Sequence, residues 1–267
     1  MTRSGTRSTL NGVPDLITPL VVDRLRAAGC VFAEEEAALL TAATDDPTHL
    51  DTLVERRATG EPLEHVLGWA EFCGLRIGVD PGVFVPRHRT EHLVHRAATR
   101  TPPHATVVDL ACGTGALGLA LHHLAGPLHT LHAVDIDPNA ATCAARNLAG
   151  IGHAHHGDLY TPLPPALHGR VDVLLANVPY VPTAGLALMP REARDHEPPV
   201  ALDGGPDGLD VLRRVAASAR TWLTPGGHLF TEASAHQAPA AAAILSAAGL
   251  TPTVERDEDA ITVVAVA

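Results

Sequence analysis

Two glycines in one short segment, Gly113 and Gly115, follow a run of apolar residues and precede an apolar helical pattern. The segment VVDLACGTG, residues 107–115, therefore predicts a strand that turns sharply into a helix. Glycine lets a backbone approach a ligand closely, and the N-terminus of the following helix offers N–H groups without partners. The same pattern also occurs as a tight turn that binds nothing, so the segment alone leaves both interpretations open.

Carboxylates follow the next two predicted strands. Asp135 ends the first of them, about twenty residues beyond the glycine turn, where a carboxylate can accept hydrogen bonds from both hydroxyls of a ribose. Asp137 is interpreted as a helix cap. Asp158 ends the second strand and can meet an adenine amino group, with the apolar Leu159 against the ring; alternatively, Asp158 is an ordinary turn residue. Because Gly113-Thr114-Gly115 lacks the third glycine of a dinucleotide site, the set favours a ligand without phosphates, such as S-adenosylmethionine.

A tetrapeptide after the strand at 171–176, Asn177-Val178-Pro179-Tyr180, could hold a methyl acceptor. The nitrogen of an amide or an exocyclic amine is a poor nucleophile, so its NH₂ group must be held with its lone pair in line with the methyl group. The Asn177 side-chain oxygen and the Val178 carbonyl supply two hydrogen-bond acceptors, Pro179 stiffens the turn, and Tyr180 can pack on a planar group. The alternative is a plain turn that begins at Asn177, with Tyr180 in the core.

The elements that position these residues fall into two patterns. Residues 1–68 predict a small helical domain, with helices from Pro19 to Gly29, over 33–43 and from Pro47 to Gly60. Residues 71–85 predict a β-hairpin whose turn is Val79-Asp80-Pro81-Gly82, within a linker over 69–90. Residues 91–267 then alternate strands with helices at about 115–125, 138–149, 207–222 and 236–248, which predicts an α/β domain with a parallel sheet. Its strands are expected at 105–111, 130–136, 153–157, 171–176, 227–233, 251–257 and 261–267, the last two antiparallel.

Composition excludes several classes of protein. With 46% hydrophobic and 18% charged residues the chain can build a core. A formal net charge of −11 disfavours a broad DNA- or RNA-binding face. The four cysteines form no C-x-x-C pair, and the 17 histidines show no metal-ligand spacing, so we expect reduced thiols and no metal. No signal peptide or membrane span is visible, and we expect a cytoplasmic protein.

The tetrapeptide NVPY resembles the N-P-P-Y motif of methyltransferases that act on planar NH₂ groups. Two further segments, residues 60–94 (GEPLEHVLGWAEFCGLRIGVDPGVFVPRHRTEHLV) and 192–215 (EARDHEPPVALDGGPDGLDVLRRV), resemble the protein-(glutamine-N5) methyltransferases of the HemK/PrmC type. The resemblance implies a Rossmann-like seven-stranded class I methyltransferase domain that uses S-adenosylmethionine. It also implies an acceptor glutamine in the GGQ motif of a peptide chain release factor, or in a ribosomal protein.

Carried over residue by residue, the resemblance implies roles for single positions. Asn177 through Tyr180 would hold the glutamine amide. Phe84 and Arg87 would close over the cofactor from the linker. The cofactor would be lined by Ala111, Cys112, Gly113, Thr114, Gly115, Asp135, Asp158, Leu159 and Asn177.

Three departures from the family pattern concern the protein substrate more than the reaction. Val178 stands where the motif has proline, Ala111-Cys112 replaces a glycine of the turn, and the C-terminal strand lacks an expected arginine. Three other hypotheses stay open: an N-methyltransferase for a small-molecule or peptide amide, a nucleic-acid adenine methyltransferase, and a non-catalytic interaction module. In the leading hypothesis the helical domain recognises the protein substrate, and the enzyme is a monomer.

Overall fold

The computed structural model describes residues 14–257 and 260–267, and it divides the chain into two compact units, residues 1–67 and 68–267. Each unit is treated by itself below. Residues 69–90, expected as a linker, lie within the larger unit. Within the described residues, no helix is both long and apolar enough to cross a membrane.

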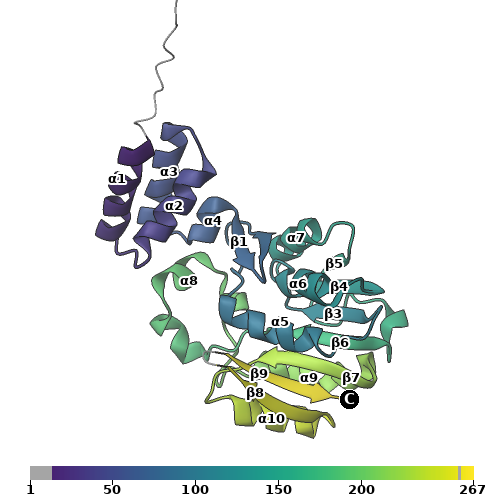
Figure 1. Cartoon of the computed structure of the whole chain (residues 1–267). Coiled ribbons are helices and arrows are strands. Elements are labelled where there is room, and N and C mark those ends of the chain that lie inside the picture. Colours follow the sequence, from purple (N-terminus) through teal and green to yellow (C-terminus); the bar gives the residue numbers. More distant parts are fainter. Residues whose placement is uncertain (1–13, 258–259) are drawn as a thin grey trace, which may run out of the picture. The chain divides into compact units, whose positions relative to one another are not determined.

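The smaller unit consists of four helices in its described part: α1 (Pro14–Ala27), α2 (Ala33–Ala43), α3 (Pro47–Ala58) and α4 (Leu63–Leu67) (Figure 1). The prediction that the first helix begins at Pro19 was wrong, because α1 begins at Pro14 and contains Pro19. Asp46 caps α3 as its sequence indicated, accepting a hydrogen bond from the Thr48 N–H at 3.0 Å. Among the buried apolar residues of this unit are Leu25, Ala37, Leu40, Leu53 and Val54.

One ion pair is buried inside the helical unit. The Arg57 guanidinium donates to the two carboxylate oxygens of Glu36, at 2.6 Å through Nε and at 3.0 Å through Nη2. The side chains are 7% and 11% exposed, respectively. The pair therefore ties α3 to α2 in a setting that water barely reaches.

The larger unit opens with a β-hairpin of β1 (Trp69–Phe72) and β2 (Leu75–Gly78). Its turn is Cys73-Gly74, not Val79–Gly82 as predicted from the sequence. Both turn residues have positive φ, +50° and +72°, as a two-residue hairpin turn of type I′ requires. Asn, Asp or Gly usually precedes the glycine of such a turn, so Cys73-Gly74 did not indicate a hairpin turn in the sequence. The Asp80-Pro81-Gly82 turn exists, but it closes a later loop in which the Val83 N–H donates to the Asp80 carbonyl.

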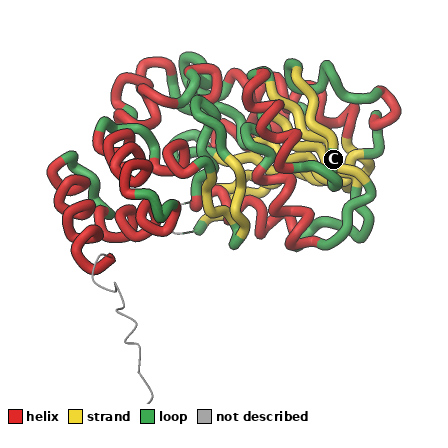
Figure 2. The backbone as a smooth tube through the Cα atoms, turned by 90° about the horizontal axis from the view of Figure 1, so that it is seen from above, coloured by secondary structure: helices red, strands yellow, loops and turns green. Residues whose placement is uncertain are grey.

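A sheet forms the centre of the larger unit (Figure 2). Its seven strands lie in the order β5-β4-β3-β6-β7-β9-β8. β3 to β7 are parallel, and β9 runs antiparallel to both β7 and β8, which confirms the predicted fold class. The outer strands are β5 and β8. The strand bounds are β3 Thr106–Leu110, β4 Thr130–Asp135, β5 His153–His156, β6 Val171–Ala176, β7 Leu223–Glu232, β8 Thr251–Arg256 and β9 Ile261–Val266.

Helices cover both faces of the sheet. Val108 and Leu174 belong to a core with α9 (Asp210–Trp222) and α10 (Ala238–Ala247). Val107 and Val173, one residue away on the same strands, belong to the other core. That second core packs against α5 (Glu91–Ala98), α6 (Ala116–Ala125) and α7 (Pro138–Asn147). Alternate side chains thus face opposite layers, as expected for a parallel sheet buried on both sides.

Three short helices that the sequence analysis did not predict lie between β6 and α9. They are η3 (Thr183–Leu188), α8 (Arg191–His196) and η4 (Pro199–Ala201). Two others are η1 (His88–Thr90), before α5, and η2 (Pro165–Leu167), before β6.

Candidate active site

A cavity of about 440 Å³ opens at the carboxyl ends of β3, β4 and β6 in the larger unit. Binding sites in parallel α/β sheets form at this edge, where the loops after successive strands meet. Residues of the segments 84–90 and 177–202 complete the walls. The cavity is lined by these sequence-predicted residues: Phe84, Arg87, Ala111, Cys112, Gly113, Thr114, Asp135, Asp158, Leu159, Asn177, Val178, Pro179 and Tyr180.

Gly115 is the one predicted residue that does not line the cavity. It precedes α6 with a φ of +76°, and a Cβ atom there would lie 3.2 Å from side-chain atoms of Ala144 and Leu148. Its glycine is therefore explained by close packing of α6 on α7. Gly113 faces the cavity instead, where an added Cβ would approach Phe84 no closer than 3.9 Å.

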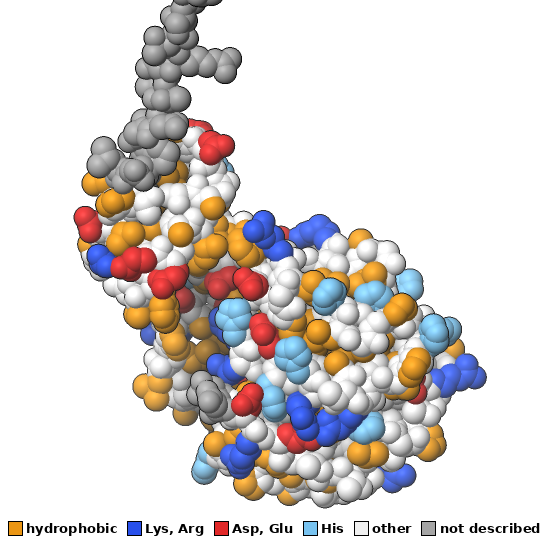
Figure 3. All heavy atoms as spheres, in the orientation of Figure 1, with side chains coloured by type: hydrophobic (Ala, Val, Ile, Leu, Met, Phe, Trp, Pro, Cys, Tyr) orange, Lys and Arg blue, Asp and Glu red, His pale blue; other side chains and the backbone are white. Residues whose placement is uncertain are grey.

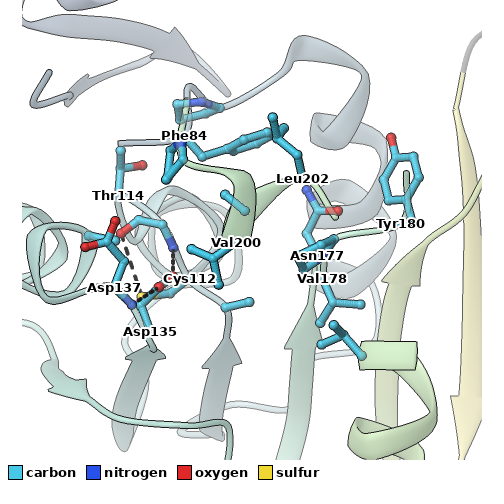
Figure 4. Close-up of a pocket in the computed structure, with 18 of the residues that line it drawn as sticks. Phe84, Cys112, Thr114, Asp135, Asp137, Asn177, Val178, Tyr180, Val200 and Leu202 are labelled. Atoms are coloured by element: carbon cyan, nitrogen blue, oxygen red, sulfur yellow. Dashed lines mark hydrogen bonds between the residues drawn. The ribbon is translucent and has the colours of Figure 1, made fainter. Parts of the chain in front are cut away.

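Asp135 is held by backbone donors at the end of β4. Its Oδ2 accepts from the Gly113 N–H at 2.8 Å and its Oδ1 from the Asp137 N–H at 2.9 Å (Figure 4). Burial raises the pKa of Asp135 above its ordinary value, while these N–H groups oppose the shift. The carboxylate thus has a fixed direction beside the glycine turn. Asp137 caps α7 through the Asn139 N–H, which confirms its predicted role.

Asp109, the first acidic residue of the turn motif, is fully buried and lies outside the cavity lining. Its Oδ2 accepts from the Gly118 N–H of α6 at 3.0 Å. Burial raises the pKa of Asp109 to about 7, and the nearby Asp135 carboxylate adds to the effect. Asp109 therefore anchors the start of α6 to the end of β3.

Asp158 has a partner that the sequence analysis missed. Arg214 of α9 donates to Asp158 Oδ2 at 2.5 Å, and both residues line the cavity. The next residue, Leu159, adopts a left-handed conformation with φ +46°. Any ligand group that reaches Asp158 thus meets a carboxylate already oriented by a guanidinium.

A stacked pair covers one side of the cavity. The Arg87 guanidinium carbon lies 4.8 Å from the centre of the Phe84 ring. Arg87 Nη2 donates to both oxygens of Glu197, at 2.6 Å and 2.7 Å, and the Val85 N–H donates to Glu197 Oε1 at 3.2 Å. Glu197 follows α8, so one buried carboxylate fixes the Phe84–Arg87 segment to the chain between β6 and α9.

Asn177 presents an acceptor atom that nothing in the protein satisfies. Its Oδ1 is one of two buried side-chain N or O atoms, among the described residues, that make no hydrogen bond; the other, His122 Nδ1, is outside the cavity lining. A buried acceptor without a donor costs about 1–3 kcal/mol. Figure 4 shows the Asn177 amide between Phe84 and Tyr180, at the wall of the cavity. The arrangement suits a ligand that brings its own N–H.

The Tyr180 hydroxyl is turned toward protein groups. It donates to Glu232 Oε1 at 2.6 Å and accepts from Arg89 Nη2 at 2.7 Å. Burial and the Glu232 carboxylate raise the pKa of Tyr180 well above its ordinary value. The phenol is therefore neutral and cannot serve as a base at physiological pH.

One group of potential metal ligands lies together among the described residues, although the sequence predicted none. Cys73, Glu91 and His95 have ligand atoms within 4.8 Å of one another, and none of them lines the cavity. Glu91 Oε1 accepts from the Cys73 N–H and contacts His88 Nδ1, each at 3.0 Å. These hydrogen bonds account for its position at the hairpin turn.

The comparisons with known proteins place this geometry in a family. A family model described as "Methyltransferase small domain" matches residues 75–189. A release factor glutamine methyltransferase of Geobacter sulfurreducens is 40% identical over 200 residues, which cover 74% of this chain and 69% of that protein. A protein of the same name from Deinococcus radiodurans is 36% identical over 266 residues, 96% of this chain and 92% of the relative. The chain belongs to the release factor glutamine methyltransferase family.

Solved structures agree with this family at the level of the fold. A methyltransferase from Pyrococcus furiosus matches with a TM-score of 0.54 and 13% identity, covering 79% of this chain and 96% of that chain. A Thermus thermophilus 16S rRNA methyltransferase, solved with AdoMet and guanosine, matches with a TM-score of 0.52 and 19% identity, over 74% and 49%. As a member of this family, the protein is a methyltransferase. The relatives also confirm the family resemblance that was inferred from residues 60–94, 177–180 and 192–215.

Arginines of this family member are interspersed with acidic groups on the face drawn in Figure 3. Among the described residues, Arg96 and Arg100 both donate to Glu255, and Arg213 donates to Asp207 and Asp210.

Proposed function

We propose that this protein transfers a methyl group from S-adenosylmethionine to the side-chain amide nitrogen of a glutamine in a peptide chain release factor. The observation that carries the proposal is the buried, unsatisfied Oδ1 of Asn177. A glutamine NH₂ group has two N–H donors, and one of them would satisfy this atom. The names of the relatives at 40% and 36% identity support the choice of acceptor.

The cavity fits the proposed cofactor. Asp135 would accept the ribose hydroxyls, because its carboxylate is already oriented by two backbone N–H groups. Gly113 leaves room for the nucleoside next to the turn, and Asp158 with Leu159 would meet the adenine. Phe84 and Arg87 would cover the bound cofactor and exclude water from it. S-adenosylmethionine supplies an electrophilic methyl group on a sulfonium sulfur, which leaves as a neutral thioether.

The acceptor residues would act by orientation. Asn177 Oδ1 and the Val178 carbonyl would each accept one N–H of the glutamine amide, which turns the nitrogen lone pair toward the methyl group. The new N–C bond forms as the S–C bond breaks, and the nitrogen then loses one proton to solvent. The nitrogen becomes acidic only after it gains the methyl group, so this scheme needs no side-chain base. Tyr180 fits it, since its hydroxyl is already donated to Glu232.

Further parts of the proposal concern the setting of the reaction. The helical unit would recognise the release factor, and the enzyme would work as a monomer in the cytoplasm, where translation terminates. A glutamine side chain must be inserted deeply to reach Asn177, because that acceptor atom is buried.

The test uses isotopically labelled S-adenosylmethionine, purified release factor and the same factor with the GGQ glutamine replaced by alanine. We expect label in the unsubstituted factor alone, at that glutamine. Asn177→Ala should lower turnover by about 100-fold or more, as losing a polar group that orients the reacting atoms does, with the cofactor Kd nearly unchanged. Asn139→Ala, which changes an exposed asparagine in the first turn of α7, is the matched control and should leave turnover unchanged. Label only in small molecules would support a small-molecule amide acceptor instead. No binding of S-adenosylmethionine at millimolar concentration would overturn the proposed reaction.

A further inference from the structure

Two arginines in the segment before α5 are each held by a buried glutamate from a distant part of the chain. Arg87 pairs with Glu197, whose side chain is 1% exposed, and Arg89 pairs with Glu232, whose side chain is 4% exposed. Glu197 follows α8, whereas Glu232 is the last residue of β7. The same short segment is therefore fixed both to the chain after α8 and to the end of β7.

Glu232 is the meeting point of three side chains. Its Oε1 accepts from Arg89 Nε at 2.9 Å and from the Tyr180 hydroxyl at 2.6 Å, while its Oε2 accepts from the Thr90 hydroxyl at 2.7 Å. Arg89 also reaches the Tyr180 hydroxyl directly at 2.7 Å. Arg89 and Thr90 follow the cover residues Phe84 and Arg87, and Tyr180 ends the acceptor tetrapeptide. Glu232 thus joins the cover of the cavity to the acceptor loop.

Burial makes this junction rigid. A buried carboxylate is stable only when donors surround it, so the three partners cannot move away from Glu232 without a large energetic cost. Hydrogen bonds to a charged group are also the stronger ones, and they restrict the rotation of the Tyr180 ring about its side-chain torsions. Asn177 and Val178 precede Tyr180 by three and two residues, so a fixed Tyr180 limits the directions that their acceptor oxygens can take.

We propose that Glu232 and Arg89 are positioning residues for methyl transfer: they hold Tyr180, and through it they keep the acceptor tetrapeptide in register with the segment that covers the cofactor. The proposal rests on the proposed function, since it names residues that serve the same acceptor site. Glu232 touches neither cofactor nor acceptor in this scheme. Its effect is on the geometry of Asn177 and Val178.

The first test is a double-mutant cycle with Glu232→Gln and Tyr180→Phe, both close in shape to the native side chains. We expect each single variant to lower kcat on the release factor by roughly ten- to a hundredfold, the size of effect that a small misplacement of reacting groups causes. The Kd for S-adenosylmethionine should change less than about threefold. Since both changes break the same contact, the double variant should be no slower than the slower single variant. Losses that multiply would overturn the proposal.

Glu197→Gln is the matched control, because it removes the equivalent buried charge from the other arginine. It loosens Phe84 and Arg87 rather than Tyr180, so its main effect should be weaker binding of S-adenosylmethionine. The same pattern of kcat and Kd in the Glu197 and Glu232 variants would contradict separate roles.

A second measurement does not depend on turnover. Hydrogen–deuterium exchange should be faster in the peptide over 177–182 for Glu232→Gln and Tyr180→Phe, and unchanged there for Glu197→Gln. Unchanged exchange in all three variants would overturn the positioning role whatever the acceptor is. Faster exchange in an enzyme that never methylates a release factor would retain the positioning role and overturn the proposed acceptor.

Discussion

The Gln237 side-chain amide donates to the Tyr180 carbonyl oxygen at 2.8 Å and to the Asp207 carbonyl oxygen at 3.0 Å. Gln237 precedes α10, and its own oxygen accepts from the Ser234 hydroxyl at 2.7 Å. Tyr180 is therefore held at two points, at its main-chain carbonyl by Gln237 and at its hydroxyl by Glu232 and Arg89.

Gly208 leaves the space in which this contact forms. A Cβ atom there would lie 2.3 Å from both Gln237 Nε2 and the Tyr180 carbonyl oxygen, and its φ is +77°. We expect Gly208→Ala to lower methyl transfer by about tenfold or more, since it displaces the acceptor loop. Gly226→Ala is the control, because Gly226 has a φ of +82° and nothing within 4 Å of an added Cβ. Both variants place a Cβ atom at positive φ, so urea unfolding should show a similar destabilisation of about 1–2 kcal/mol in each. Equal turnover in the two variants would show that the contact is unimportant.

Asp135 should control cofactor affinity. Asp135→Ala removes a charged hydrogen-bond acceptor, and a hydrogen bond to a charged group contributes about 1.5–3 kcal/mol. The Kd for S-adenosylmethionine should therefore rise by roughly 10- to 100-fold. Calorimetry measures this directly. Asp80→Asn, which breaks only the exposed contact with Arg146, should bind as the native protein does. An unchanged Kd for Asp135→Ala would remove this residue from the proposed ribose site.

Asp109 should make stability depend on pH. Its folded pKa of about 7 lies above the ordinary value of 3.8, so between these values the folded state retains a proton that the unfolded chain releases. Its contribution is full below about pH 4 and is lost as the pH rises through about 7. Asp109→Asn can still accept from the Gly118 N–H but has no such dependence. The free energy of unfolding of Asp109→Asn relative to native should rise by on the order of 4 kcal/mol between pH 4 and pH 8. Parallel pH profiles for the two proteins would contradict the raised pKa of Asp109 in the folded state.

The helical unit should depend on its buried ion pair. Arg57→Met leaves Glu36 charged and buried, so the free energy of unfolding of the full chain, obtained by chemical denaturation, should fall by about 3–5 kcal/mol. Asp51→Asn breaks an exposed contact with Arg24 and should cost less than about 1 kcal/mol. A double variant, Glu36→Leu with Arg57→Met, should recover much of the loss, because it leaves no unpaired charge. Equal losses for the exposed and buried contacts would contradict the expected cost of leaving Glu36 buried without its partner.

Local sequence signals predicted the parts of the site that local geometry decides. The apolar run 171–176 became β6 over the same residues, and Asp137 before Pro138 became the cap of α7. The glycine turn, Asp135 and the tetrapeptide meet at one cavity because parallel strands end at one edge. These features follow from the spacing of apolar residues, from helix-capping residues and from strand direction, all of which can be inferred from the sequence.

Contacts between distant segments could not be predicted in this way. Glu232 and Gln237 lie more than fifty residues from Tyr180, and neither belongs to a motif that names its partner. Arg214 sits in an amphipathic helix, where an arginine is ordinary, and only the fold brings it to Asp158. The helices between β6 and α9 were missed because their proline-rich sequence has no clear period.

The two outer strands of the sheet bear on how this protein behaves in concentrated solution. β5 has four residues, and three of them are histidines, two of which, His153 and His156, are exposed. β8 contains Pro252, which has no N–H to offer a neighbouring chain. Short polar edges and edge prolines are the devices by which natural sheets resist stacking onto one another. The architecture that opens a binding cavity at one end of its strands thus discourages aggregation along its sides.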